Sequence, residues 1–216
     1  MRVSAPLLSL LGHELRAPAG VLGGYLALLE QDAERLTARQ RQALAGARRA
    51  QQTIVDGLDD LRRLTIAWRA EEEPQTTIAL PTLVREVEQI AASRQVPLTV
   101  AADSTVALPR RGRDALLAES LVTLAEVVAR ETGVAVHATT VEDDASLTWQ
   151  VRPVQPPAGA VVREDFDLWR PGLGVRLVTA AVTIEAVGGT LVDLRAEGLR
   201  AGIDAVFPRA DAGTPA

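Results

Sequence analysis

The first 70 residues carry the hydrophobic spacing of two helices. Between residues 5 and 30, apolar side chains recur every three or four positions, which favours a helix over the strict alternation of a strand. This first stripe consists of Leu7, Leu8, Leu11, Leu15, Leu22, Tyr25, Leu26 and Leu29. A second stripe, with a period near 3.5 residues, predicts a helix over residues 37–69. Its members are Leu44, Ala47, Ala50 or Gln51, Ile54, Leu58, Leu61, and Leu64 or Thr65.

The short polar segment between these stripes, residues 31–37, predicts an antiparallel helical hairpin. A single hairpin leaves part of its apolar seam facing water, because two helices cannot cover each other on every side. Pairing with a second copy buries that seam in a four-helix bundle. We therefore expect a homodimer.

The remaining sequence predicts an α+β sandwich, with helices on one face of an antiparallel or mixed sheet. Periodicity and turn residues predict helices over 81–94, 114–130 and 173–185, and strands over 96–100, 105–108, 134–140, 146–151, 190–194 and 205–207. The expected organisation is a hairpin domain over 1–72, a charged, Pro-containing linker over 73–80, an α/β domain over 81–209 and a disordered tail over 210–216.

Composition narrows the function classes. The net charge of −5 and the absence of a basic stripe argue against nucleic acid as a partner. The chain has no cysteine and two histidines far apart, His13 and His137, so a thiolate or multi-histidine metal site is not expected. We read His137, in an alternating segment, as a packing or surface residue. No apolar run reaches the length of a transmembrane helix, and we expect a cytoplasmic protein.

The strongest chemical signal is the run Gly12-His13-Glu14-Leu15-Arg16-Ala17-Pro18 on the first predicted helix. An unprotonated imidazole nitrogen is a nucleophile near neutral pH, so His13 can accept a phosphoryl group. The neighbouring Glu14 can orient the ring or accept the proton from its second nitrogen. Pro18 lacks the N–H that would bond to the carbonyl of Glu14, so we expect a bend in the helix after the histidine.

This run resembles the phosphoacceptor box of sensor histidine kinases, and the likeness extends over about the first 70 residues. The resemblance implies that His13 carries the phosphoryl group on a dimerising hairpin and that Arg16 and Ala17 contact a partner. Ala17 stands where the family usually has Thr or Asn. Because an alanine side chain forms no hydrogen bond, phosphatase activity of the usual kind is not expected.

The α/β domain resembles the ATP-binding domain of the same family, but its nucleotide motifs are degraded. Alignment of the predicted helix over 114–130 places Glu126 where the family has its magnesium-holding Asn, and Val122 where it has the earlier Asn. The Asp and the glycines of the adenine-reading loop are missing from residues 152–158. A remnant of the phosphate-binding glycines remains at Gly172 and Gly174.

The resemblance leads to three hypotheses. The favoured one is a histidine phosphotransferase of two-component signalling, in which His13 exchanges a phosphoryl group with response-regulator receiver domains. It holds no cofactor tightly: the receiver supplies the magnesium ion, and ATP is not required. The second is a divergent ATP-dependent histidine kinase with Glu126 on magnesium. The third is a non-catalytic adaptor that binds receivers or a true kinase.

Overall fold

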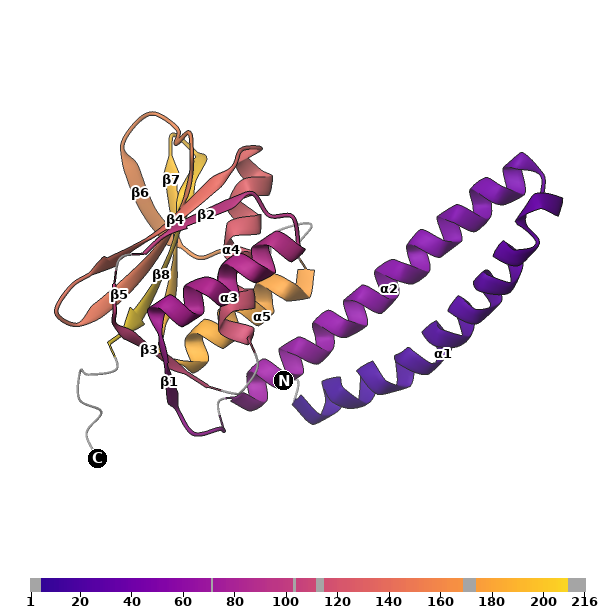
Figure 1. Ribbon diagram of the computed structural model, residues 1–216, viewed down its shortest axis with the longest axis horizontal. Helices are drawn as coiled ribbons and strands as arrows, with labels where there is room; N and C mark the ends of the chain where they lie inside the picture. The colour runs from indigo at the N-terminus through magenta and orange to yellow at the C-terminus, as the bar shows by residue number, and fades with distance from the viewer. Residues whose placement is uncertain (1–4, 71, 103, 112–114, 169–173, 210–216) are drawn as a thin grey trace. The chain divides into compact units, whose positions relative to one another are not determined.

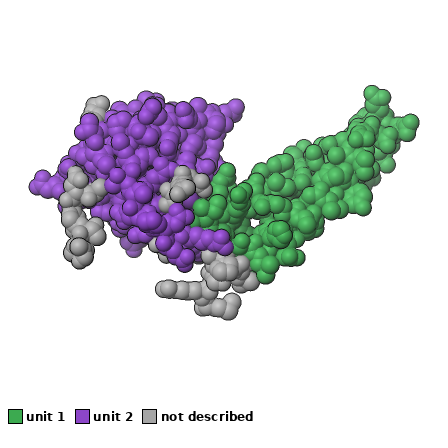
Figure 2. Space-filling model, turned by 60° about the horizontal axis from the view of Figure 1, so that its bottom comes forward, with its two compact units in different colours: residues 1–66 green, residues 67–216 purple. Residues whose placement is uncertain are grey.

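The computed structural model describes residues 5–70, 72–102, 104–111, 115–168 and 174–209, with side chains in the first helix from residue 9 onward. The chain divides after Ile66 into two compact units, which Figure 2 shows in different colours. None of the helices in the described ranges is long and apolar enough to span a bilayer.

The first unit is a helical hairpin of α1 (Ala5–Gln31), a short 3-10 turn (Ala33–Arg35) and α2 (Ala38–Ala70), whose last residues belong to the second unit (Figure 1). A capping box begins α2. The backbone N–H of Thr37 donates to Gln40 Oε1 at 2.8 Å, and the N–H of Gln40 donates back to Thr37 Oγ1 at 3.3 Å. Helix α1 continues through Pro18, so the expected bend does not end the helix.

The hairpin buries only part of its apolar stripes. Ala19 and Leu26 of α1 and Leu58 and Leu64 of α2 are buried, each 6% exposed. Large side chains elsewhere on the two stripes remain 42–65% exposed, namely Leu11, Leu15, Leu22, Tyr25, Leu29 and Ile54. A substantial apolar surface of the single hairpin therefore faces solvent.

The second unit is a six-stranded mixed sheet with three helices on one face (Figure 1). Its strand order is β2 (Leu98–Ala101), β4 (Val136–Glu142), β5 (Ser146–Pro153), β8 (Leu199–Pro208), β7 (Thr190–Ala196) and β6 (Val161–Asp165). The helices are α3 (Leu80–Ser93), α4 (Leu116–Thr132) and α5 (Gly174–Ala186). All strand pairs in this sheet are antiparallel except β2 with β4.

The core of this unit lies between the sheet and its helices. Along β5 every second residue is buried, and Trp149 faces the helices together with Phe207 of β8, both fully buried. Helix α4 is buried along most of its surface because it packs against the sheet, α3 and α5. The residues of α4 are thereby held in place relative to the start of α5. Two residues expected at the nucleotide site, Glu126 and Gly174, lie on these two helices.

Two strands occur where the sequence pattern did not predict them. Within the expected linker over 73–80, β1 (Thr76–Ala79) pairs with β3 (Ala107–Arg110) in a separate two-stranded sheet. The paired residues of β1 and β3 lie 28 to 34 positions apart in the sequence, so the local composition of residues 73–80 indicated only a linker. Strand β8 also begins earlier than the predicted strand over 205–207, at Leu199.

The second unpredicted strand, β6, forms one edge of the large sheet. It pairs with β7 along one side, and all five of its residues are exposed. Its sequence is Val161-Val162-Arg163-Glu164-Asp165, with two exposed valines followed by three charges. Because neither face of β6 is buried, its sequence lacks the alternation that marks a half-buried strand.

Candidate functional site

His13 lies on α1 with its side chain exposed. Glu14, the next residue, is also exposed. Within the described part of the chain, neither the imidazole nor this carboxylate forms a hydrogen bond or ion pair. The ring is therefore accessible to an incoming phosphoryl donor, and the orienting contact expected from Glu14 is not formed in this state.

Arg16 lies one turn further along α1 and links the two helices of the hairpin. Its Nη2 donates to Asp59 Oδ1 of α2 at 2.7 Å. The two side chains are 48% and 53% exposed, so the pair sits at the surface of the hairpin. Ala17, the other residue expected to contact a partner, is exposed one turn after His13. The helix surface next to His13 thus presents the guanidinium of Arg16, which is paired with Asp59, and the small apolar side chain of Ala17.

The other polar links between the two helices lie nearer the loop. Gln51 Nε2 of α2 donates to the carbonyl of Ala19 at 3.4 Å. Arg48 of α2 donates to the carbonyl of Gly23 at 3.3 Å and lies 3.7 Å from the carboxylate of Glu30. All three acceptors follow Pro18, whereas Arg16 and His13 precede it. The Arg16–Asp59 pair is therefore a polar link between the helices on the histidine side of the proline.

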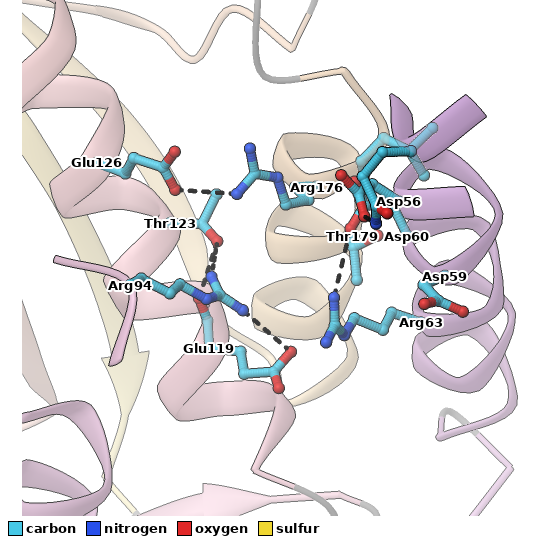
Figure 3. Close-up of polar contacts among 12 residues, drawn as sticks. Asp56, Asp59, Asp60, Arg63, Arg94, Glu119, Thr123, Glu126, Arg176 and Thr179 are labelled. Atoms are coloured by element: carbon cyan, nitrogen blue, oxygen red, sulfur yellow. Dashed lines mark hydrogen bonds and ion pairs between the residues drawn. The ribbon is translucent and has the colours of Figure 1, made fainter. Parts of the chain in front are cut away.

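In the second unit, Glu126 of α4 forms an ion pair with Arg176 of α5, with 3.2 Å between Oε2 and Nη1 (Figure 3). The side chains are 19% and 31% exposed, so the pair is partly shielded from water. The carboxylate expected at the magnesium position therefore already has a cationic partner. Val122, one turn earlier on α4, is fully buried in the hydrophobic core and offers no ligand atom.

A second polar cluster lies along the same helix. Arg94 donates to Thr123 Oγ1 at 3.4 Å and lies 3.5 Å from a carboxylate oxygen of Glu119 (Figure 3). An open pocket of about 450 Å³ borders this cluster, with Arg94, Glu126 and Arg130 in its lining. In the described ranges, no group of three His, Asp or Glu side chains is arranged to hold a metal ion.

The loop after β5 differs from an adenine-reading loop in its backbone as well as its side chains. The N–H of Val154 donates to the carbonyl of Ala135 at 2.9 Å, so it is already used within the fold. Pro156 and Pro157 have no N–H to offer a ligand.

The structure describes one of the two glycines expected to bind phosphate, Gly172 and Gly174. Gly172 lies outside the described residues. Gly174 starts α5 with a φ of +51°, a left-handed conformation that glycine adopts without strain.

The fold was compared with known structures. The chain is similar to the Acinetobacter baumannii histidine kinase AdeS, with a TM-score of 0.54 and 19% identity over 92% of this chain and 98% of that chain. The chain has a sensor-histidine-kinase-like fold. The resemblance inferred from the phosphoacceptor run is confirmed at the level of the fold, and the six-stranded sheet with helices on one face is that of a histidine-kinase ATPase domain.

The chain is also similar, over 63% of its length and at 17% identity, to two further histidine kinase structures, of which it covers 98% and 96%. They are the mycobacterial sensor kinase MprB, with a TM-score of 0.44, and the catalytic domain of the kinase ThkA, with a TM-score of 0.43. No protein-family model matches the chain, and no curated protein matches its sequence.

Sequence reasoning placed His13, Arg16 and Glu126 on helices of this sensor-kinase-like fold but missed Asp59, the partner of Arg16, and Arg176, the partner of Glu126. Arg176 is 50 residues from Glu126, and Asp59 is 43 residues from Arg16. No spacing rule connects residues so far apart. A partner for Arg16 on α2 could have been expected, because Asp59 lies on the helix predicted to pack antiparallel to α1.

Proposed function

We propose that this protein is a histidine phosphotransferase of two-component signalling. His13 attacks the phosphoryl group on a receiver aspartate: the acyl-phosphate P–O bond breaks, a P–N bond to the imidazole forms, and the carboxylate leaves. The reverse step on a second receiver completes the relay. Each receiver brings the magnesium ion that such a transfer needs.

The hairpin supports this role. The exposed His13 sits on a regular helix, where a receiver domain can reach it. Glu14 follows it directly and is free to orient the ring once a partner excludes water. Ala17 supplies no side-chain hydrogen bond to a hydrolytic water, which favours transfer over loss of the phosphoryl group.

The exposed apolar stripe supports a dimer. Side chains such as Leu15, Leu22 and Leu29 are 42–52% exposed on one hairpin, and a matching stripe on a second copy would cover them. The assembly we propose is a four-helix bundle made of two hairpins. It would present one His13 from each protomer.

The observation that favours a phosphotransferase over a kinase is the Glu126–Arg176 ion pair. A magnesium ion at this position would have to displace a guanidinium and then sit beside its positive charge. The prolines after β5 remove N–H groups from the loop that would have to read adenine. Both features oppose productive binding of magnesium-ATP.

The second candidate is an ATP-dependent histidine kinase. The fold likeness to the kinase AdeS, over almost the whole of both chains, favours it. So does Gly174, whose left-handed backbone at the start of α5 suits a phosphate-binding turn. In this case Arg176 would leave Glu126 when nucleotide binds.

One experiment separates the candidates. The protein is mixed either with radiolabelled phospho-receiver domains or with magnesium and γ-labelled ATP, and acid-labile, base-stable label is followed with time. A phosphotransferase gains label from a receiver and none from ATP, and a kinase gains it from ATP. Label that still arrives in the His13→Gln variant contradicts both. Label that never arrives from either donor leaves the adaptor function.

A further inference from the structure

Arg16 is placed to contact a phosphoryl group on His13. Residues three apart on a helix lie on the same face, with Cβ atoms about 5–6 Å apart. Both side chains are exposed on α1, and Arg16 is long enough to turn toward His13. In the unphosphorylated hairpin its guanidinium binds Asp59 instead, at 2.7 Å.

The ion pair between Arg16 and Asp59 can be broken easily when a stronger anion competes for Arg16. Both partners are about half-exposed, and ion pairs at that level of exposure are weak because water screens them. A phosphoryl group offers three acceptor oxygens and close to two negative charges, against one on a carboxylate. Guanidinium also matches phosphate oxygens with two parallel hydrogen bonds. The balance therefore favours the phosphoryl group once it is present.

We propose that Arg16 is a positioning residue that leaves Asp59 and binds the phosphoryl group when His13 is phosphorylated. This inference rests on the proposed function, because it requires a phosphoryl group on His13. Arg16 would hold the phosphoryl oxygens in one orientation for attack by the next receiver.

The exchange also changes the hairpin. Without Arg16, Asp59 becomes an unpaired carboxylate on a helix that carries Asp56 and Asp60 close by. The contacts that Arg48 and Gln51 of α2 make with α1 lie beyond Pro18. The segment of α1 that carries His13 thus loses its polar link to α2. Phosphorylated and unphosphorylated hairpins would differ at the surface that a receiver contacts.

A chemical donor makes the test independent of any receiver. Potassium phosphoramidate phosphorylates the imidazole directly: its own P–N bond breaks, ammonia leaves, and a new P–N bond forms on the ring. The phosphorus NMR signal of the full-length protein is then titrated with pH, and the His13→Gln variant identifies the signal that belongs to His13.

A nearby guanidinium favours the dianionic phosphoryl group and lowers its titration midpoint. We expect the midpoint to rise by about 0.5–1 pH unit in Arg16→Gln, the size of a charge contact at the protein surface. Arg16→Lys should restore part of the difference. Asp59→Asn should leave the midpoint at or below that of the wild type, because it releases Arg16. Arg48→Gln removes a hairpin arginine on the loop side of Pro18 and should change nothing.

Equal midpoints in the wild type and Arg16→Gln would overturn the inference. A midpoint that rises as much in Arg48→Gln as in Arg16→Gln would also overturn it, since the contact would then not be specific to Arg16. If receivers do not exchange label with His13, the proposed function is wrong. The phosphorus NMR midpoints of the wild type and Arg16→Gln can still be compared, because the chemical donor needs no receiver.

Discussion

The carboxylate of Glu126 on α4 lies 3.2 Å from the guanidinium of Arg176 on α5, across 50 residues of sequence. Both side chains are partly shielded, and separating them would leave each charge in a poorly hydrated position. The pair therefore links the two helices and occupies the carboxylate that the family resemblance places at the magnesium position.

Magnesium-ATP is expected to leave the melting temperature of the protein unchanged at millimolar concentration. A ligand present at a hundred times its Kd adds about 2.7 kcal/mol to the free energy of unfolding, so even moderate binding would be visible in a thermal melt. The measurement is a melt with and without nucleotide, repeated by calorimetry. A melting temperature that climbs with ATP concentration would restore the kinase candidate.

Replacement of exposed leucines on α1 should dissociate the dimer. Light scattering of the wild type should give twice the chain mass of 23.0 kDa. Leu22→Glu combined with Leu29→Glu should give the monomer mass, because each change would bury an unpaired charge in the bundle. Val162→Glu, at an exposed valine of β6, is the control and should not alter the mass. A wild-type monomer at micromolar concentration would refute the assembly.

Leu58 is a poorer site for that test than the exposed leucines. Its side chain is 6% exposed and packs inside the single hairpin. A charge at Leu58 would unfold the hairpin as well as separate the protomers, and the two effects would be indistinguishable by mass alone.

A buried arginine should make the core of the second unit sensitive to charge removal. Arg200 of β8, 4% exposed, binds Asp193 of β7 at 2.6 Å and also pairs with Glu131 of α4. Asp193→Ala should lower the free energy of unfolding by about 3–5 kcal/mol, because it leaves a buried charge without its buried partner. Denaturant unfolding measures the change.

Two companion variants test the cause of that loss. Asp193→Leu combined with Arg200→Met should recover most of the stability, since it replaces both charges with apolar groups. Glu164→Gln, which breaks the exposed pair with Arg195, should cost less than about 1 kcal/mol. If the double variant is no more stable than Asp193→Ala, the loss does not come from the buried charge of Arg200.

Asp143, in the turn between β4 and β5, should contribute stability that depends on pH. The backbone N–H groups of Ala145 and Ser146 and the Ser146 hydroxyl donate to its carboxylate at 2.7–2.9 Å and hold its pKa below the usual value. A lowered pKa in the folded state stabilises the protein at pH values above the unfolded pKa, and this is lost as pH falls through the folded value.

The Asp143→Asn variant isolates this contribution. Its melting temperature should lie below that of the wild type near neutral pH, and the two should converge in acid as Asp143 becomes protonated. A difference that stays constant from pH 7 to acid would assign the effect to the amide's geometry rather than to the carboxylate charge.

The helical elements were largely predictable from the sequence. Both hairpin helices have stripes long enough to fix their type, and the Thr37–Gln40 capping box marks where α2 begins. Strands such as β5 were predicted because apolar and polar residues alternate along them. Strands β1 and β6 were missed because one depends on a distant partner and the other is exposed on both faces.

The candidate site was predictable only where its chemistry is local. The run from Gly12 to Pro18 places a nucleophile next to an acid, with a proline four residues after the acid, so its chemistry can be predicted without knowledge of the fold. Arg176 and Asp59 acquire their roles from helix packing. An arginine on a partly buried face has many possible partners, and composition does not distinguish among them.

Strand β6 ends the sheet with a row of backbone groups that no neighbouring strand uses in the described chain. Such an edge invites another chain to pair with it, and the exposed Val161 and Val162 would add apolar contact. The next three residues carry a positive and two negative charges, and two of them are held in ion pairs, Arg163 with Asp204 and Glu164 with Arg195. An incoming strand would have to desolvate these charges. The charges on this edge thus oppose strand pairing between chains, so the self-association that we propose for the hairpin would not extend through the sheet into aggregation.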